Sequence, residues 1–574
     1  MPGRKWLNKS AGKIVGLFLG MALLLIILTG CDIADVLGYD IQVEITGLDE
    51  EEIGDLRVIA NGNVLDEFDY ENGTARGTLA NLRRENKIEP EHGDREFYQE
   101  FVRVDSSRAG ETIRFNAIKS HNVTADLQSH VDEAGPGDTL IVFHGVHEEI
   151  TITTLGLTIE AFFDHNEEYT AISGVSIKAD DVCLKGFTIP AGSQIKVADS
   201  SGITLEKNII AGDNSMTGVE IQRSSAVIRD NVIEARLTGL SAVSSSDLKL
   251  DNNMIRENKS QGLVLEGSQA EITDNEIGYN EYGISFDDSD VFLGNNVIHY
   301  NGAGNDGAGI YAHSSSLKLE GNEINRNSTG IRAENSRKFE LLNGDILRSY
   351  AAGARIEGGP VSISDSIFKS NGQAALELLS NSEVEIEDSE FENNEYGILL
   401  NSVDNFKISK NTFYYNNEYG INMTASSGEF SGNEVEFNYN GLLQQEGGNL
   451  VIKYNDFEDQ SAAGLIIDNS AAEIEFNNIR YNGSKGAEFI GETAVAESFI
   501  SRNNIQENAL GVIAHGGEED LLDNIKLDAA SNWWGTDNGD RDEDEIRLEI
   551  EEMIEGPVEF EPFEKNEIDE AGQS

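Results

Sequence analysis

One short motif recurs along most of the chain and constrains the fold more than any other feature. It is an asparagine, any residue, then isoleucine, valine or phenylalanine, and successive copies start 21 to 26 residues apart. Its asparagines are Asn208, Asn231, Asn253, Asn275, Asn296, Asn322, Asn411, Asn433, Asn455, Asn477 and Asn503. The same place in the intervening copies is held by Gly344, Ser366 and Ser389. A unit of this length is one turn of a solenoid, because it buries its apolar side only by stacking on its neighbours.

Within each copy, apolar and polar residues alternate over three to five positions, as in residues 383–387. This alternation is typical of β-strands, and no apolar stripe of helical spacing is long enough for a helix. A glycine and an apolar residue, such as Gly283 and Ile284, follow most motifs by eight or nine residues. Leucine-rich repeats have a similar length, but their leucine spacing is missing. We therefore predict an all-β fold, a single-stranded parallel β-helix whose motif asparagines sit at inward bends and hydrogen-bond the next coil.

Three features resemble the right-handed parallel β-helix superfamily of pectate-lyase-like and NosD-like proteins. They are the repeat itself, the entry segment at residues 134–149, and Asn-Trp-Trp-Gly at 532–535 followed by Gly-Pro-Val at 556–558. The resemblance covers about residues 120–565 and implies a right-handed coil. It leaves the activity open, because this scaffold hosts many functions. A NosD-like role in copper-site maturation is not favoured, since the six methionines form no cluster with histidine.

Residues 38–118 lack the motif and form a separate predicted domain. Segments such as 41–45 and 56–60 alternate like half-buried antiparallel strands, and two Asn-Gly pairs are turn signals. The pattern resembles the small Ig-like β-sandwich modules of bacterial surface proteins. We predict that this sandwich is a spacer, with ligand binding as the alternative. The β-helix with its C-terminal cap is predicted to fill residues 119–565, and residues 566–574 to form an acidic tail.

The N-terminus has the layout of an export signal. Residues 1–30 contain four basic residues, the apolar run 14–28, and small residues directly before Cys31. The Leu-Thr-Gly-Cys sequence resembles a bacterial lipobox, which implies that Cys31 is lipidated and that residues 31–37 are a linker. We expect a chain exported and lipid-anchored to the cell membrane or cell surface, with a transmembrane anchor as the alternative. No disulfide is expected, because the only other cysteine, Cys183, stands in an apolar context and is predicted to lie in the core.

The chain is strongly acidic. Its 103 Asp and Glu residues against 42 Lys and Arg residues give a formal net charge of −61. Such a surface repels nucleic acid and anionic lipid headgroups, so neither is an expected partner. The charge is typical of halophilic proteins, in which salt screens repulsion within about 3 Å at 1 M. Calcium binding is the alternative explanation of the acidic charge. We also expect the protein to be a monomer.

One segment near the C-terminus is dense enough in carboxylates to be a calcium candidate. Its aspartates are Asp537, Asp540, Asp542 and Asp544. Carboxylate oxygens are the ligands that Ca²⁺ prefers. A calcium loop that starts at Asp540 requires glycine at its sixth position, where this chain has Glu545. We therefore expect no cofactor, with Ca²⁺ at this segment as the alternative.

Polar residues concentrate on one predicted sheet of the β-helix. Counted from the glycine of each Gly-apolar pair, positions +1 and +3 face the core and positions +2 and +4 face solvent. In the middle coils these outward positions hold Asp287, Tyr311, His313, Arg332, Glu334, Arg355, Glu357 and Glu377. Side chains on adjacent coils lie about 5 Å apart. We therefore expect these residues to form one continuous patch.

The patch favours acidic-sugar chemistry if it is catalytic. Arg332 and Arg355 would neutralise a uronate carboxylate. Tyr311 or His313 would remove the acidified C5 proton. Substrate would be bound by Asp287, Glu334, Glu357 and Glu377. However, alternating Arg and Glu also keeps like charges apart on an exposed sheet, and the Tyr-Gly-x-Asp-Pro-His signature of alginate epimerases is absent.

The function we predict from the sequence is therefore binding of extracellular or cell-envelope polysaccharide along this sheet. Two alternatives stay open. One is a polysaccharide lyase or C5-epimerase that acts on uronate glycans, and the other is a structural or adhesive surface protein without glycan chemistry.

Overall fold

The computed structural model describes residues 39–46, 48, 50–71, 74–82, 86–92, 96–97, 102–104, 108–118, 126–162, 169–302, 307–515, 526–536 and 542–572. The chain divides into two compact units, Met1–Gly145 with Thr154–Thr170, and Val146–Thr153 with Ala171–Ser574. The predicted export signal, Cys31 and the linker lie outside the described residues, so the lipid anchor stays a prediction. The predicted domain boundary after residue 118 also stays a prediction.

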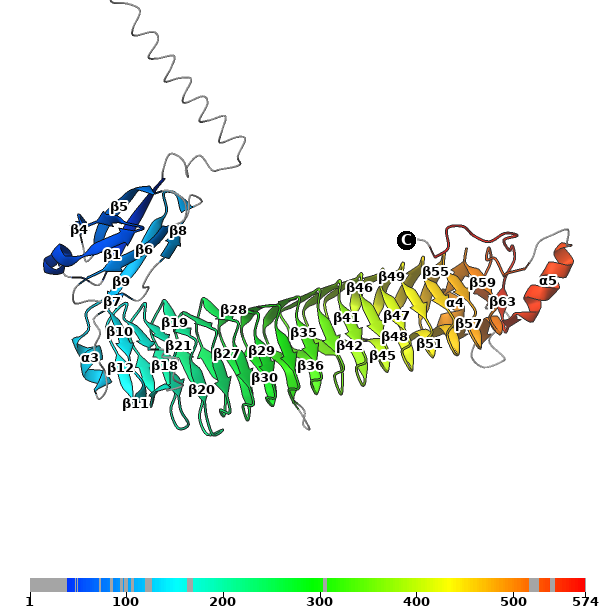
Figure 1. The fold of residues 1–574 in the computed structure, drawn as a ribbon. Helices are drawn as coiled ribbons and strands as arrows, with labels where there is room; N and C mark the ends of the chain where they lie inside the picture. The colour runs from blue at the N-terminus through cyan, green and yellow to red at the C-terminus, as the bar shows by residue number, and fades with distance from the viewer. Residues whose placement is uncertain are drawn as a thin grey trace, which may run out of the picture. The chain divides into compact units, whose positions relative to one another are not determined.

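The first unit contains a small β-sandwich (Figure 1). Its sheets have the strand orders β4-β5-β1-β9-β7 and β3-β2-β6-β8. The strands are β1 (Tyr39–Thr46), β2 (Arg57–Ala60), β3 (Asn63–Leu65), β4 (Asp69–Glu71), β5 (Thr74–Leu82), β6 (Asn86–Glu91), β7 (Glu96–Phe97), β8 (Val102–Val104) and β9 (Thr112–Ile118). Alternate residues of both sheets, such as Val43 on β1 and Val58 on β2, pack in one apolar core. This packing explains why apolar and polar residues alternate in the sequence of these strands.

The same unit holds helix α3 (Leu127–Glu133) and the paired parallel strands β10 (Thr139–Val142) and β13 (Thr158–Ala161). The side chain of Asp126 caps α3 by accepting a hydrogen bond from the amide of Ser129 at 3.2 Å. The strands β10 and β13 pair in register over their whole length.

The second unit is a parallel β-solenoid whose strands repeat in threes. One coil consists of β28 (Gln269–Thr273), β29 (Glu276–Gly278) and β30 (Tyr282–Asp287). Each strand pairs in parallel with the third strand after it. Three sheets result, called here sheet 1 (β28 and its equivalents), sheet 2 (β29 and its equivalents) and sheet 3 (β30 and its equivalents). The predicted parallel β-helix is therefore confirmed, and Figure 1 shows its coils in one row.

Sheet 3 carries the candidate site. Its strands in this unit are β12 (Ile150–Ile152), β15 (Val175–Ile177), β18 (Ile195–Ala198), β21 (Val219–Gln222), β24 (Leu240–Val243), β27 (Gln261–Glu266), β30, β33 (Ala308–His313), β36 (Thr329–Glu334), β39 (Ala354–Glu357), β42 (Ala374–Leu379), β45 (Tyr396–Asn401), β48 (Tyr419–Thr424), β51 (Asn440–Gln445), β54 (Ala463–Asp468), β57 (Lys485–Ile490), β60 (Leu510–His515) and β62 (Ile554–Glu555). Two short helices, α4 (Glu492–Glu497) and α5 (Glu543–Glu552), interrupt the last coils.

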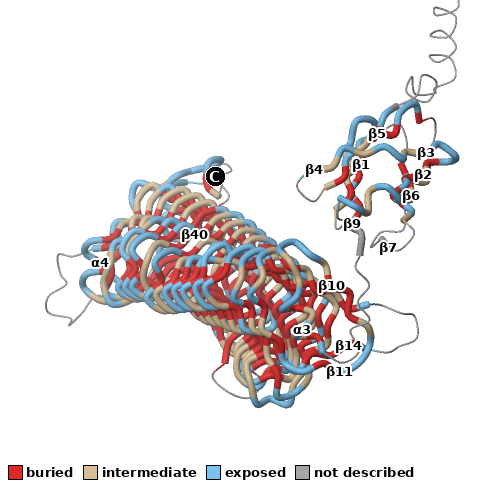
Figure 2. Tube along the Cα trace, turned by 90° about the vertical axis from the view of Figure 1, so that its left-hand side faces the viewer, coloured by how far each residue is buried: buried red, intermediate tan, exposed pale blue. Residues whose placement is uncertain are grey.

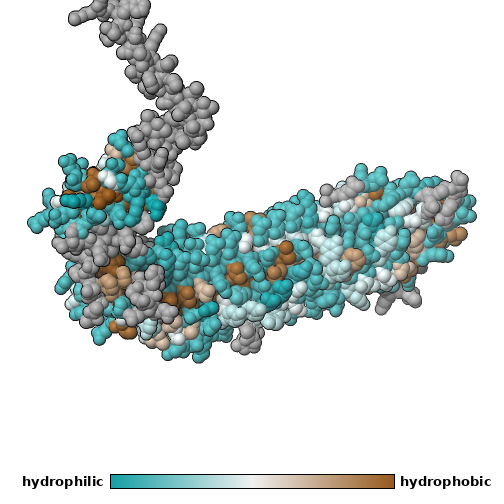
Figure 3. Space-filling view, in the orientation of Figure 1, coloured by the Kyte–Doolittle hydropathy of each residue, from teal (hydrophilic) through white to brown (hydrophobic). Residues whose placement is uncertain are grey.

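The inward residues of successive coils form one apolar core (Figure 2). On β30, Ile284 and Phe286 are fully buried and Asp287 is exposed, as the count from the glycine predicts. The core is partly aromatic. A column of nearly parallel rings, with centroids 5.1 and 4.9 Å apart, is formed by Phe368, Phe391 and Phe413. Outside this core, hydrophilic residues cover most of the face seen in Figure 3.

The motif asparagines form a buried ladder at the bend between sheets 1 and 2. The Nδ2 of Asn231 donates to Oδ1 of Asn253 at 3.0 Å, and the Nδ2 of Asn253 donates to Oδ1 of Asn275 at 2.9 Å. Each rung also donates to a carbonyl of the preceding coil, as Asn231 does to Leu205 at 2.9 Å. The predicted ladder is confirmed, and it pairs polar groups that the bend would otherwise leave buried and unsatisfied.

Two further ladders, which the sequence reading missed, follow the other bends. Between sheets 2 and 3, the Nδ2 of Asn258 donates to Asn280 at 3.0 Å, and that of Asn280 donates to Asn301 at 3.1 Å. Between sheets 3 and 1, backbone amides donate to serine hydroxyls of the next coil, as Ser245 does to Ser268 at 3.1 Å. Side chains therefore fix the register at all three bends.

Cys183 does not lie in the core, contrary to the prediction. It starts β16 (Cys183–Lys185), on which Leu184 is fully buried while both its neighbours are only partly buried. The apolar context Val-Cys-Leu is misleading because successive residues of a strand face opposite sides of the sheet. The two flanking apolar residues point inward, so the cysteine between them points outward.

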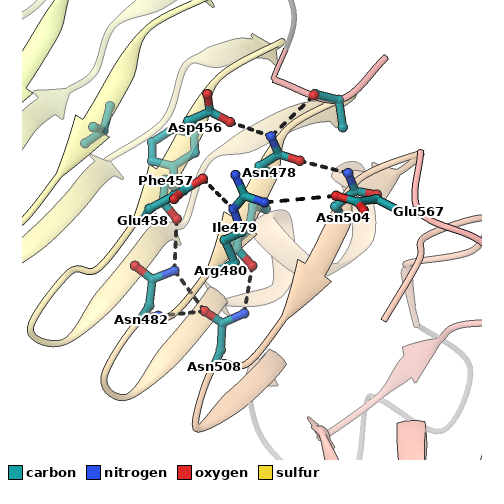
Figure 4. A network of polar contacts seen from close by, with 12 residues as sticks. Asp456, Phe457, Glu458, Asn478, Ile479, Arg480, Asn482, Asn504, Asn508 and Glu567 are labelled. Carbon is teal, nitrogen blue, oxygen red and sulfur yellow. Dashed lines mark hydrogen bonds and ion pairs between the residues drawn. The ribbon is translucent and has the colours of Figure 1, made fainter. Parts of the chain in front are cut away.

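A C-terminal segment, residues 562–572, lies along the outer face of sheet 2 (Figures 1 and 4) and is called the strap here. It contains most of the predicted acidic tail. The amide of Ile568 donates to Oδ1 of Asn504 at 2.8 Å, and the Nδ2 of Asn504 donates back to the carbonyl of Ile568 at 3.1 Å. The Nδ2 of Asn478 donates to the carbonyl of Ala571 at 3.3 Å. The strap is therefore docked by asparagines in the outward row of sheet 2.

Carboxyl groups of sheet 2 near the strap have raised pKa values. Burial raises the pKa of Asp456, although Asn478 donates a hydrogen bond to it at 2.5 Å. Burial also raises the pKa of Glu458, although this carboxyl pairs with Arg480. Glu567 of the strap lies 4.0 Å from Arg480 (Figure 4). Ionising these carboxyls therefore costs free energy in the folded state.

Docking of the strap should weaken as the pH rises. The folded state binds these two protons more tightly than the unfolded chain, so their contribution is present below the unfolded pKa values of about 3.9 and 4.3. It is lost as the pH rises through the raised folded values. The amide of Gly572 donates to the carbonyl of Phe476 at 2.8 Å. We expect its hydrogen-exchange protection factor to fall as the pH rises above about 4, and Asp456→Asn to flatten this dependence. An equally steep fall in the variant would contradict the assignment to Asp456.

Candidate functional site

The outward rows of sheet 3 bring together a group of polar side chains, called here the sheet-3 patch: Asp287, Tyr311, His313, Arg332 and Glu334. They stand on β30, β33 and β36. His313 is in register with Asp287 on one side and with Glu334 on the other, and Tyr311 is in register with Arg332. The confirmed register of the coils therefore makes neighbours of residues more than twenty positions apart.

Tyr311, Arg332 and Glu334 form one hydrogen-bonded group. The Tyr311 hydroxyl donates to Oε2 of Glu334 at 3.0 Å. The Nε and Nη2 of Arg332 donate to Oε1 of the same carboxylate at 2.8 and 2.5 Å. The guanidinium also lies over the Tyr311 ring, with Cζ 5.7 Å from the centroid. The charge of Arg332 is thus balanced within the patch, and all three side chains are held in place.

His313 is bonded through both ring nitrogens. Its Nδ1 lies 2.8 Å from Oδ1 of Asp287, and its Nε2 lies 3.2 Å from Nδ2 of Asn335. The neutral ring with its proton on Nδ1 fits both contacts, because it donates to the carboxylate and accepts from the amide. To act as a base through Nε2, His313 would have to give up the contact with Asn335.

Two pKa shifts define the electrostatics of the patch. Burial, together with the hydrogen bond to Glu334, raises the pKa of the Tyr311 phenol. Burial acts in the same direction on Glu334, but hydrogen bonds from Arg332 and Tyr311 outweigh it and lower the pKa of this carboxyl. Tyr311 therefore stays protonated at neutral pH. In this arrangement it is a hydrogen-bond donor and a poor base.

The other predicted residues continue the rows beyond the patch. Arg355 on β39 is in register with Arg332, and its Nη1 lies 3.5 Å from Oε2 of Glu377. Glu357 is exposed at the end of the same strand. Among the eight predicted residues, two guanidinium groups face four carboxyl groups. This excess of carboxylates on the protein repels the carboxylate of a uronate ligand.

A shallow hollow of about 300 Å³ opens beside the patch, and it is lined by Gln261, Tyr282, Ser285, Tyr311 and Arg332. The rings of Tyr282 and Tyr311 are 5.8 Å apart and tilted to one another. Sequence reasoning did not assign Gln261 or Tyr282 to the site, because it counted outward positions only after the glycine. The strands begin one residue earlier, where Gln261 and Tyr282 are in register. Alternation continued backwards through the glycine would have placed them inward. The pattern breaks at this point, since Gly262 and Leu263 are both buried on β27.

The structure offers no support for a metal site in its described part. Asp537 and Asp540 lie outside the described residues. Asp542 caps α5, accepting a hydrogen bond from the amide of Asp544 at 3.1 Å, and Asp544 lies 3.6 Å from Arg547. No group of three His, Cys, Asp or Glu side chains placed to hold a metal occurs among the residues described. Calcium at this segment stays a prediction.

A family of known sequences accounts for the solenoid. The model described as "Right handed beta helix region" matches residues 172–324, 308–449 and 440–533, which together exceed half of the chain. The chain belongs to this family. The match confirms the right-handed parallel β-helix implied by the resemblance. No curated protein matches the chain. Among the helices within the described segments, none is long and apolar enough to cross a membrane.

Several solved structures are similar to this β-helix. The periplasmic alginate epimerase AlgG is 15% identical over 56% of this chain and 80% of its own, with a TM-score of 0.29. The A-module of mannuronan C-5 epimerase AlgE4 of Azotobacter vinelandii is 12% identical over 70% and 96%, with a TM-score of 0.26. The catalytic unit of an α-1,3-glucanase from Streptomyces thermodiastaticus is 13% identical over 83% and 86%, with a TM-score of 0.28. Likeness of this degree carries no inference about the chemistry of this chain.

Proposed function

We propose that this β-helix binds a neutral polysaccharide at the hollow beside the sheet-3 patch. The observation that carries the proposal is the hollow itself, in which two tyrosine rings stand beside the polar groups of Gln261 and Ser285. Pyranose rings present apolar C–H faces, which pack against aromatic side chains, and hydroxyl groups, which bond to amides and hydroxyls. An open surface repeated along a solenoid also suits an extended chain.

The state of the patch supports binding rather than catalysis. A lyase or epimerase needs a cation for the uronate carboxylate and a base for the C5 proton. Here Arg332 is held by Glu334, Tyr311 has a raised pKa, and His313 is bonded at both nitrogens. Side chains held in place in this way suit recognition of a ligand. Catalysis by Tyr311, His313, Arg332 and Arg355 stays a prediction.

Tyr282→Ala should weaken the binding of neutral glucan oligosaccharides by at least about tenfold, or about 1.4 kcal/mol. The variant removes one aromatic wall of the hollow and leaves the rest of the patch intact. Isothermal titration with cello-, laminari- and nigero-oligosaccharides measures the effect. Tyr396→Ala is the matched control, because Tyr396 also precedes a glycine on sheet 3 but stacks on Tyr419, 6.1 Å away. Equal losses in the two variants would contradict a site at the hollow.

An assay with polyuronate as substrate distinguishes glycan binding from the lyase alternative. Depolymerisation with an unsaturated, ultraviolet-absorbing product that is lost in His313→Ala and Arg332→Ala would replace this proposal by the lyase alternative. Absence of binding to neutral and acidic glycans alike would leave a structural or adhesive surface protein.

The exported, lipid-anchored location belongs to the same proposal and is supported by the sequence of residues 1–31. Expressed in a bacterial host, the chain should incorporate labelled fatty acid and sediment with membranes. Cys31→Ser should abolish both, because acyl chains supply the membrane affinity of such an anchor. Membrane association that persists in the variant would favour the transmembrane alternative.

A further inference from the structure

A second aromatic surface lies at the bend between sheets 2 and 3. Tyr279, Tyr300 and Arg326 directly follow β29, β32 (Val297–His299) and β35 (Glu323–Asn325) in three successive coils. Their φ angles are +61°, +54° and +54°, in the left-handed region. Large side chains are uncommon there, since glycine and asparagine adopt this conformation at lower cost. These three residues are called the corner stack here. The left-handed conformation belongs to the bend itself, because Glu257 and Tyr415 adopt it at the same position of other coils.

The corner stack is well ordered. The rings of Tyr279 and Tyr300 are 5.2 Å apart and within 6° of parallel. The Cζ of Arg326 lies 5.5 Å from the Tyr300 centroid, on the following coil. His299 packs edge-on against both tyrosines at 5.4 and 5.5 Å. Gly278 leaves room for it, because a Cβ there would lie 2.9 Å from Nε2 of His299. A planar cation thus already covers one end of the stack.

The other end of the stack is open. Tyr279 is 53% exposed. A hollow of about 430 Å³ adjoins its ring and is lined in part by Glu257, Lys259 and Glu281. Glu257 takes the place of Tyr279 in the preceding coil, since β26 (Met254–Arg256) and β29 pair in register directly before these two residues. None of the three charged side chains forms an ion pair with another described residue. They are available to a ligand.

We infer that the open face of Tyr279 binds a glycan that carries protonated amino groups, such as a polymer of deacetylated hexosamine. The electron-rich face of a tyrosine attracts cations, and Arg326 makes this same contact at the opposite end of the stack. The two carboxylates of the hollow outnumber its one lysine, and the chain as a whole carries a net charge of −61. This field favours a cationic sugar over an acidic one.

This inference does not depend on the proposed function of sheet 3. The corner stack uses Tyr279, whereas the sheet-3 hollow uses Tyr282 and a different set of polar groups. The two ligands also differ in charge. Variants at one site therefore leave the other intact, and either proposal can fail alone.

The test compares two hexasaccharides on the full chain by titration at about pH 6, where amines are protonated. They are the glucosamine hexamer and the N-acetylglucosamine hexamer, of which only the first is charged. We expect the charged hexamer to bind at least about tenfold more tightly and to weaken as salt is added. Tyr279→Ala should reduce its affinity at least about tenfold, and Tyr279→Phe should retain most of it. Glu257→Gln combined with Glu281→Gln should also weaken it, without changing the response to the acetylated hexamer.

Tyr415→Ala is the matched control for the aromatic ring. Tyr415 occupies the same bend, with φ +53° and 51% exposure, and its ring stacks on Phe437 at 5.2 Å. This variant should leave the affinity for the glucosamine hexamer unchanged. Equal binding of the two hexamers, or an affinity unaffected by the paired glutamine variant, would overturn the inference. The glutamine variant keeps the ring stack, so it decides the question even if Tyr279→Ala unfolds.

Discussion

Replacing Asn433 by leucine is expected to lower the free energy of unfolding by about 3 to 5 kcal/mol. Asn433 is 1% exposed. Its Nδ2 donates to the carbonyls of Ile408 and Ser431 and to Oδ1 of Asn455. Its Oδ1 accepts from the backbone amide and the Nδ2 of Asn411. Leucine has a similar size but satisfies none of these groups, and each buried polar group left unpaired costs about 1 to 3 kcal/mol.

The control for this prediction is Asn417→Leu in the neighbouring coil. Asn417 is exposed, and its backbone amide donates to the carbonyl of Asn394 at 2.8 Å, so its side chain is free to change. We expect a difference within about 0.5 kcal/mol. Urea denaturation followed by circular dichroism measures both, and amide exchange locates the loss in the adjoining coils. A loss of equal size in both variants would mean that the ladder is not what stabilises this bend.

Arg236→Met should also be strongly destabilising, by about 3 to 5 kcal/mol. Arg236 is 1% exposed, and burial lowers the pKa of its guanidinium. Its amide donates to Asn258, so it begins the ladder between sheets 2 and 3. Its side chain donates to carbonyls of two preceding coils at 2.5 to 2.8 Å, namely those of Ser193, Ile189 and Ala211. Methionine would fill part of the space and leave these carbonyls buried without donors.

Two further variants sharpen this prediction. Arg236→Lys should recover only part of the lost stability, since an ammonium group cannot reproduce the fork of a guanidinium. Arg223→Met is the control, because Arg223 is 59% exposed and pairs with Asp199 at the surface, where ion pairs contribute little. Thermal melting compares the three proteins. Full recovery with lysine would show that charge alone, rather than the carbonyl contacts, holds this position.

The sequence predicted the solenoid because its strongest signal is also its strongest physical constraint. An asparagine at an inward bend is tolerated only with a partner, so Asn253 and Asn275 mark the register directly. The second ladder follows the first by five residues, as Asn258 follows Asn253, and a count at that offset would have revealed it. The docking of the strap has no comparable periodic signal in the sequence. It joins Asn504 to Ile568, which are far apart in the chain and share no periodic position.

The sequence predicts which residues of the site are neighbours, but not which hydrogen bonds they form. Register alone places Tyr311 beside Arg332. The Arg332 guanidinium and the Tyr311 phenol both donate to Glu334. This choice of carboxylate depends on side-chain conformations, which the spacing of residues does not encode. The corner stack was missed for another reason. Residues at a bend belong to neither alternating row, so Tyr279 and Tyr300 escape a count of strand positions although they are 21 residues apart.

The side-chain ladders also bear on how such a molecule could change in size during evolution. Each rung offers the next coil the same donors and acceptors that it receives from the one before, so whole coils are interchangeable units. Duplication of one coil would lengthen the protein without a new kind of contact, whereas a shorter insertion must bulge outward at a bend. The longer copy between Asn296 and Asn322 keeps the ladder intact, since the Nδ2 of Asn296 still donates to Oδ1 of Asn322 at 2.9 Å across 26 residues.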